Sequence, residues 1–218
     1  MPKQRYERRL DAANLKVRDV ATQDGETTQG VTLEGYAAKF DEPTVLFADS
    51  SSKVVEVIRP GSFANALAED QDVRALVDHN ASLILGRTKA GTLSLVEDEV
   101  GLYFRLTLPD TTIARDLAEN IRLGNVNNCS FAFTPRSNGE ASRTEQEGEI
   151  RVTYIELTDV DLFDVSIVTY PAYAGTTVSI EARCRAIADR PGRVSRRNTR
   201  KAAAIRLADF LLKRKGKK

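Results

Sequence analysis

His79, Ser130 and Asp164 lie in three separate segments of this 218-residue chain, and together they could form a nucleophilic triad. His79 is the only histidine, and histidine is the side chain whose ordinary pKa lies nearest neutrality, so it is the obvious general base. Ser130 could act as the nucleophile, and Asp164 could orient the imidazole. The chemistry that such an arrangement performs is acyl transfer.

Each of these residues also has an ordinary structural interpretation. A single histidine at a strand end is most often structural or exposed, a strand serine usually has no chemical role, and Asp164 could pair with an arginine. Cys129 is a rival nucleophile. Because adjacent strand residues point to opposite faces, only one of Cys129 and Ser130 can enter a site, and the spacing does not choose between them.

The segment around Asp164 predicts a strand with a carboxylate on a mostly apolar face. Period-two alternation groups Asp164 with Val160, Leu162, Ser166 and Val168. If that face is the core, the carboxylate must be hydrogen-bonded or ion-paired, because an isolated buried charge is costly.

Short segments rich in β-branched and aromatic residues recur about every ten residues, with turn signals between them. They are residues 31–40, 53–58, 73–78, 92–97, 101–108, 128–134, 150–157, 160–168 and 177–182. This regular spacing, with the two helices described below, predicts a β-rich α+β fold. It permits two architectures, a barrel and a sandwich.

Two helices interrupt the predicted strands. Asp110 or Thr111 can cap the first, in which apolar residues recur at four-residue spacing before Gly124 ends it. A shorter helix is expected after Ser62. The polar run from Arg136 to Gly148 predicts a mobile loop between two strands.

Charge divides the chain into an acidic body and a basic tail. Residues 183–218 carry 14 basic and two acidic side chains, a net charge of +12, against −11 for residues 1–182. We expect a polar N-terminal extension over 1–30, a folded domain over 31–182, and a basic linker with an amphipathic helix over 183–218. The tail could dock on the body, on acidic protein segments or on nucleic acid.

The composition argues against several classes of protein. Two distant cysteines and one histidine cannot build the usual zinc sites, so no metal or other cofactor is expected. No apolar run is long enough to span a membrane, and the N-terminus is charged throughout, so a soluble protein is expected. An acidic body with 6% aromatic residues argues against a nucleic-acid binder, except through the tail.

Three separated motifs resemble the prohead (capsid maturation) protease family of tailed bacteriophages, which is related to the herpesvirus assemblins. The first is EGYAAKFDEP from Glu34 with VIRPGSFANAL from Val57, and the second is DHN followed by LGRT. The third is NCSFAF with LFDVSIVTYPAY. The resemblance covers roughly Val31 to Ala182, with the order of the motifs preserved. The family usually has glycine at Ala132 and often glutamate at Asp164.

The resemblance implies a closed β-barrel flanked by helices, with His79 as general base, Ser130 as nucleophile and Asp164 as the third triad member. It implies a serine endopeptidase that cleaves the scaffolding part of the major capsid protein, and itself, during procapsid maturation. The expected location is the host cytoplasm, inside the immature procapsid, and dimerisation is an expectation of the same kind. The alternative is a non-catalytic capsid-assembly or scaffold protein that retains the fold. No motif marks an oxyanion hole, for which Arg136 is one candidate.

Overall fold

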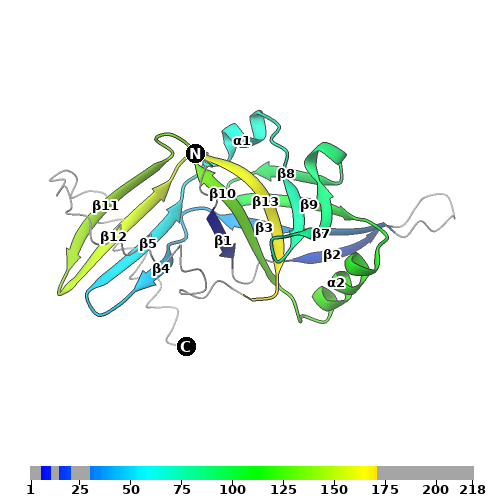
Figure 1. Cartoon of the computed structure of the whole chain (residues 1–218), viewed down its shortest axis with the longest axis horizontal. Helices are drawn as coiled ribbons and strands as arrows, with labels where there is room; N and C mark the ends of the chain where they lie inside the picture. The colour runs from blue at the N-terminus through cyan, green and yellow to red at the C-terminus, as the bar shows by residue number, and fades with distance from the viewer. Residues whose placement is uncertain (1–5, 11–14, 21–29, 171–218) are drawn as a thin grey trace.

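The computed structural model describes residues 6–10, 15–20 and 30–170, whose strands form three sheets (Figure 1). The predicted strand at 177–182 and the basic tail at 183–218 lie outside these residues. The β-rich α+β class is confirmed. No closed barrel is found among the described strands, so the predicted barrel is not confirmed.

A five-stranded sheet carries the predicted site residues. Its order is β1 (Tyr6–Leu10), β10 (Asn128–Pro135), β13 (Val160–Val168), β6 (Arg74–Val77) and β7 (Asn80–Arg87). Strand β10 pairs antiparallel with both β1 and β13, whereas β13 and β6 run parallel. In Figure 1, the short dark-blue β1 lies beside β10. This order brings segments that are far apart in the sequence into direct contact.

The other two sheets have four strands each. One has the order β2 (Lys16–Val20), β3 (Gly30–Lys39), β9 (Gly101–Leu108) and β8 (Leu93–Glu97). The other has the order β11 (Glu140–Glu147), β12 (Ile150–Leu157), β5 (Ser52–Ile58) and β4 (Thr44–Ala48), and it projects to the left in Figure 1. Strands β1 and β2 thus come from the segment that the sequence predicts as an N-terminal extension.

The predicted mobile loop between Arg136 and Gly148 is wrong, because most of it forms strand β11. This strand lies at the edge of its sheet and pairs antiparallel with β12. Its polar side chains still find partners across the pair: the Arg143 guanidinium lies 4.2 Å from the Tyr154 ring centroid. Edge strands are commonly polar, so the lack of apolar residues marked an exposed edge and not a loop.

Both predicted helices are present. Helix α1 spans Ala64–Ala68, and α2 spans Thr112–Arg122. The N-cap of α2 is Thr111, whose hydroxyl oxygen accepts a hydrogen bond from the Ala114 backbone N–H over 3.3 Å. A 3-10 turn, η1, covers Thr88–Ala90.

Aromatic packing holds β10 against the core. Phe131 and Phe133 alternate on one face of the strand, and both are almost completely buried. Their ring centroids are 5.1 Å apart, and the Phe63 ring lies edge-on to Phe131 at 5.4 Å. Because alternate strand residues point to opposite faces, this packing directs Ser130 and Ala132 away from the aromatic core.

Candidate active site

The side chains of Ser130, His79 and Asp164 form one hydrogen-bonded chain. Ser130 Oγ lies 2.5 Å from His79 Nε2, and His79 Nδ1 lies 2.7 Å from Asp164 Oδ1. All three side chains are buried. The structure therefore brings together the three residues that the sequence selects, in the order nucleophile, base and acid that acyl transfer requires.

Cys129, the rival nucleophile, lies in the hydrophobic core and not in this cluster. Burial raises the pKa of the Cys129 thiol far above its ordinary value, because the apolar surroundings disfavour the thiolate. Only Ser130 of the two is next to the imidazole.

A β-bulge in the pairing of β10 with β13 places Asp164 beside His79. The register places Ala132 opposite Asp164, but the next residue, Phe133, is opposite Leu162. Directly opposed residues lie on the same face of a sheet. Leu162 therefore faces the core with Phe133, whereas Asp164 lies on the face of Ala132 and Ser130.

This bulge corrects the predicted alternation, which placed Val160 and Leu162 on the face of Asp164. Val160 and Leu162 belong to the core cluster together with Val165 and Ile167. A bulge adds one residue to one strand and so exchanges the two faces beyond that point. The carboxylate consequently lies against polar partners, and the apolar side chains on both sides of it stay in the core.

A tight turn between β6 and β7 presents His79. Val77 pairs with Asn80, so Asp78 and His79 form a two-residue loop, and both have left-handed backbone angles, φ 47° and 56°. The carboxylate of Asp78 ties this loop to the end of β13: its Oδ1 accepts from the Thr169 backbone N–H over 2.9 Å, and its Oδ2 accepts from the Thr169 hydroxyl over 3.2 Å. Asp78 thereby connects the strand that carries Asp164 to the turn that carries His79.

Ser166 is a second polar partner of the site. Its side chain is completely buried, and its hydroxyl donates to Asp164 Oδ1 over 2.7 Å. It lies directly opposite Ser130 across the β10–β13 pair. Strand alternation predicts Ser166 on the face of Asp164, but no role for it was expected from the sequence. The available signal was a hydroxyl two residues after a buried carboxylate on the same strand.

Strand β1 covers Ser130. Arg9 is opposite Ser130 in the register, and the Ser130 hydroxyl donates to the main-chain oxygen of Arg8 over 2.8 Å. The Glu7 carboxylate lies 3.8 Å from His79 Nε2. With β1 in this position, Ser130 has no exposed surface, so in this state a substrate cannot reach the hydroxyl.

Arg136 lies in an acidic cluster away from the triad. Its guanidinium donates to Glu69 over 2.7 Å and forms an ion pair with Asp161 at 2.8 Å. Both partners are at the end of β10 remote from Ser130, so Arg136 does not form the oxyanion hole that the sequence analysis considered. Within the described residues, no group of three or more potential metal ligands is found.

None of the helices in the described parts of the chain is both long and apolar enough to cross a membrane. No curated protein matches the chain. Among solved structures, the chain is similar to the capsid assembly protease gp21 of bacteriophage T4, with 12% identity and a TM-score of 0.48 over 78% of this chain and 100% of that one.

The family described as Caudovirus prohead serine protease matches residues 15–190. The match includes all three motifs that carry the resemblance, and it begins at β2, earlier than the predicted domain start at residue 31. The predicted resemblance is confirmed: this chain belongs to the prohead serine protease family of caudoviruses.

Proposed function

We propose that this protein is a serine endopeptidase in which Ser130 is the nucleophile, His79 the general base and Asp164 the group that orients the imidazole. The observation that carries the proposal is the continuous hydrogen-bonded chain from the Ser130 hydroxyl through both ring nitrogens of His79 to the Asp164 carboxylate. Membership of a serine protease family supports the same reaction class.

The geometry fits the two halves of an acyl transfer. When the Nδ1–H group of His79 donates a hydrogen bond to Asp164, Nε2 is unprotonated. Nε2 can then accept the Ser130 proton while Oγ attacks the peptide carbonyl carbon. The imidazolium then donates that proton to the leaving amine, and the acyl-enzyme remains. In the second half, His79 takes a proton from water, the hydroxide attacks the ester, and Ser130 Oγ leaves with the proton.

Ser166 and Asp78 would act as positioning residues in this mechanism. The Ser166 hydroxyl holds the Asp164 carboxylate in one orientation, and Asp78 holds the His79 turn against β13. A triad depends on such alignment, because small displacements of the base lower the rate steeply.

The proposed substrate is the scaffolding part of the major capsid protein, with cleavage of the protease itself as a second event. Both would take place inside the immature procapsid in the host cytoplasm. The family description supports a role in the prohead. In such a setting the basic tail at 183–218 would dock on acidic segments of the scaffold.

One observation favours a second candidate, a non-catalytic assembly protein with the protease fold. Ser130 is completely buried beneath β1, and a nucleophile that no substrate can reach does not turn over. The protease requires that β1 moves away from Ser130, whereas the non-catalytic assembly protein does not.

The experiment that separates them is the intact mass of the major capsid protein encoded with this chain, after co-expression with wild type, Ser130→Ala or Cys129→Ala. A protease predicts trimming by wild type and by Cys129→Ala, and none by Ser130→Ala. If wild type is incorporated into particles and the capsid protein keeps its full mass, the proposal is wrong and the assembly protein is favoured.

A further inference from the structure

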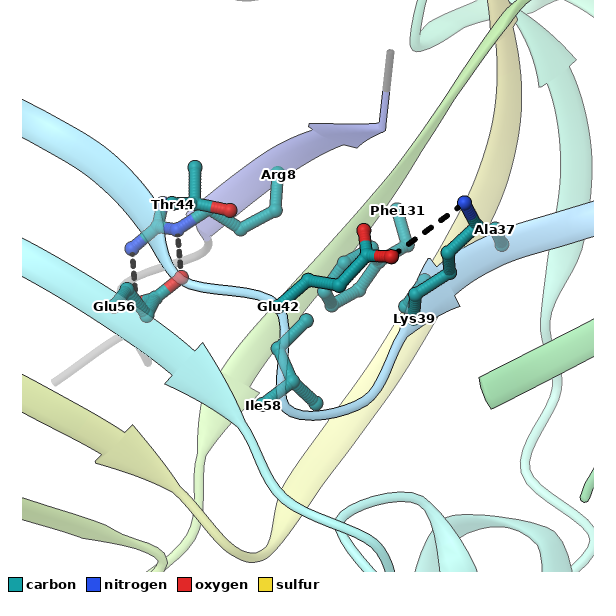
Figure 2. Close-up of a pocket in the computed structure, with 9 residues that line it drawn as sticks. Arg8, Ala37, Lys39, Glu42, Thr44, Glu56, Ile58 and Phe131 are labelled. Carbon is teal, nitrogen blue, oxygen red and sulfur yellow. Dashed lines mark hydrogen bonds and ion pairs between the residues drawn. The ribbon is translucent and has the colours of Figure 1, made fainter. Parts of the chain in front are cut away.

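The side chain of Arg8 occupies a buried acidic pocket beside the proposed nucleophile. Its Nη2 donates to Glu56 Oε2 over 2.7 Å, and its Nε donates to the other carboxylate oxygen. Figure 2 shows this paired contact between β1 and β5. Arg8 is 6% exposed and Glu56 is 2% exposed, so water is excluded from the pair.

The surroundings of the pair also suit a cation with an alkyl stem. The guanidinium of Arg8 lies 5.3 Å from the centroid of the Phe133 ring. A cavity of about 30 Å³ adjoins the pair, with Ala37, Ile58 and Phe131 among its lining residues. Lys39 and Glu42, which form an ion pair at 3.7 Å, also line the cavity. The apolar residues and the Glu56 carboxylate form the part of the pocket that holds the long basic side chain of Arg8.

Glu56 needs a cation in this place. Glu56 lies within β5, and its carboxylate is almost completely buried. Arg8 from β1 covers this carboxylate and neutralises its charge. A buried carboxylate that loses its partner destabilises a fold strongly. A peptide strand that replaces β1 beside β10 should therefore bind more tightly when it carries a basic side chain that can pair with Glu56.

Strand β1 is suited to replacement. It has five residues, it is at the edge of the five-stranded sheet, and within that sheet it pairs only with β10. When β1 leaves, the backbone donors and acceptors of β10 become an open edge, and an extended peptide can add to such an edge as a new strand.

The register relates the pocket to the site of chemistry. Arg8 fills the pocket with its side chain, and its main-chain oxygen lies 2.8 Å from Ser130 Oγ. In a protease, the residue whose carbonyl lies at the nucleophile is the one on the acyl side of the bond to be cut. One residue of β1 thus meets both the nucleophile and the pocket.

Resting on the proposed function, we propose that Glu56 determines substrate specificity: it binds the Arg or Lys side chain on the acyl side of the scissile bond, in a peptide strand that adds to β10 in place of β1. Strand β1 is the internal occupant of this site, with Arg8 in the position of that basic residue. The substrate class is accordingly a peptide with a basic residue before the cleaved bond.

The test measures peptide binding to the full chain carrying Arg8→Ala, which vacates the pocket, and Ser130→Ala, which prevents turnover. Two labelled peptides are compared by fluorescence anisotropy: one has the sequence of residues 4–12, and the other has Met in place of Arg8. We expect the arginine peptide to bind roughly tenfold or more tightly, as buried charge pairs do. The matched control adds Glu56→Gln, which keeps the shape of the side chain and is expected to abolish the preference.

Equal affinities for the two peptides, a preference that survives Glu56→Gln, or no binding of either peptide would each overturn the proposal. Circular dichroism checks that the variants fold. If Arg8→Ala does not fold, Arg8→Met replaces it, because methionine keeps an apolar stem but leaves Glu56 without its cation. The same preference is then expected.

The binding assay is independent of turnover, so its failure and the failure of the proposed function are distinguishable. If the capsid protein is trimmed in a Ser130-dependent way but peptide binding does not depend on Glu56, only the proposed specificity pocket is wrong. If peptide binding depends on Glu56 but no trimming occurs, only the proposed protease function is wrong.

Discussion

The hydroxyl of Ser130 donates to the main-chain oxygen of Arg8 over 2.8 Å while its oxygen lies 2.5 Å from His79 Nε2. A hydroxyl has one proton to donate. When that proton is directed to Arg8, it is not directed to the imidazole that would remove it. The arrangement with β1 in place is therefore a resting state of the proposed triad.

Weakening the anchor of β1 should expose Ser130. We expect Arg8→Lys to label with a fluorophosphonate probe about fivefold faster than wild type, because losing part of the paired contact costs about 1 kcal/mol. The measurement is the rate of the mass shift on the peptide that contains Ser130. Arg59→Lys, which alters an arginine paired with Asp41 and Glu156, is the control and should label at the wild-type rate. Equal rates for all three proteins would mean that the Arg8 contact does not restrain access.

Removing the hydroxyl of Ser166 should lower activity without unfolding the protein. Ser166→Ala deletes a hydrogen bond to a buried carboxylate, a contact of about 1.5–3 kcal/mol, so we expect kcat/KM to fall roughly 10- to 100-fold. A misoriented Asp164 also supports the imidazolium less well, so the acidic limb of the pH–rate profile should shift. Ser166→Thr keeps the hydroxyl and should recover most of the rate. A fall in thermal stability with an unchanged pH profile would assign Ser166 a structural role only.

The Asp78 turn offers a paired comparison. Asp78→Ala loses both bonds to Thr169 and puts alanine, which tolerates left-handed backbone less well than aspartate, at φ 47°. Asp78→Asn keeps an acceptor oxygen and tolerates the left-handed region. We expect Ala to lower both the melting temperature and kcat/KM, the latter about tenfold or more, and Asn to stay near wild type. Similar losses for both variants would show that the negative charge of Asp78 matters more than the turn.

Cys129 should make the free energy of unfolding depend on pH in the alkaline range. Burial raises the pKa of its thiol in the folded chain above the ordinary value of about 8.5. Above that pH the unfolded chain releases the proton and the folded chain keeps it. The free energy of unfolding should therefore fall as pH rises, by about 1.4 kcal/mol per pH unit. Denaturant titrations at several pH values measure this, and Cys129→Ala should remove this component. A difference between the two proteins that does not change with pH would refute the prediction.

The candidate site could be predicted from the sequence because its motifs resemble those of the prohead protease family and because His79 is the only histidine. Strand alternation predicts that Cys129 and Ser130 point to opposite faces, but it does not say which of them enters the site. The cap and spacing of the helix that begins at Thr112 are likewise local signals. The helix cap, the helix spacing and the strand alternation each depend on neighbours within a few residues, so the linear sequence contains that information.

The tertiary structure decided what depends on pairing between distant segments. The bulge opposite Phe133 turns Asp164 towards His79 and Leu162 into the core, and it exists only where β10 meets β13. The polar β11 became a strand because β12 offers it a partner. Strand β1 covers Ser130 across 122 residues of sequence. The contact of Arg8 with Glu56 joins β1 to β5, two segments that no local sequence pattern relates.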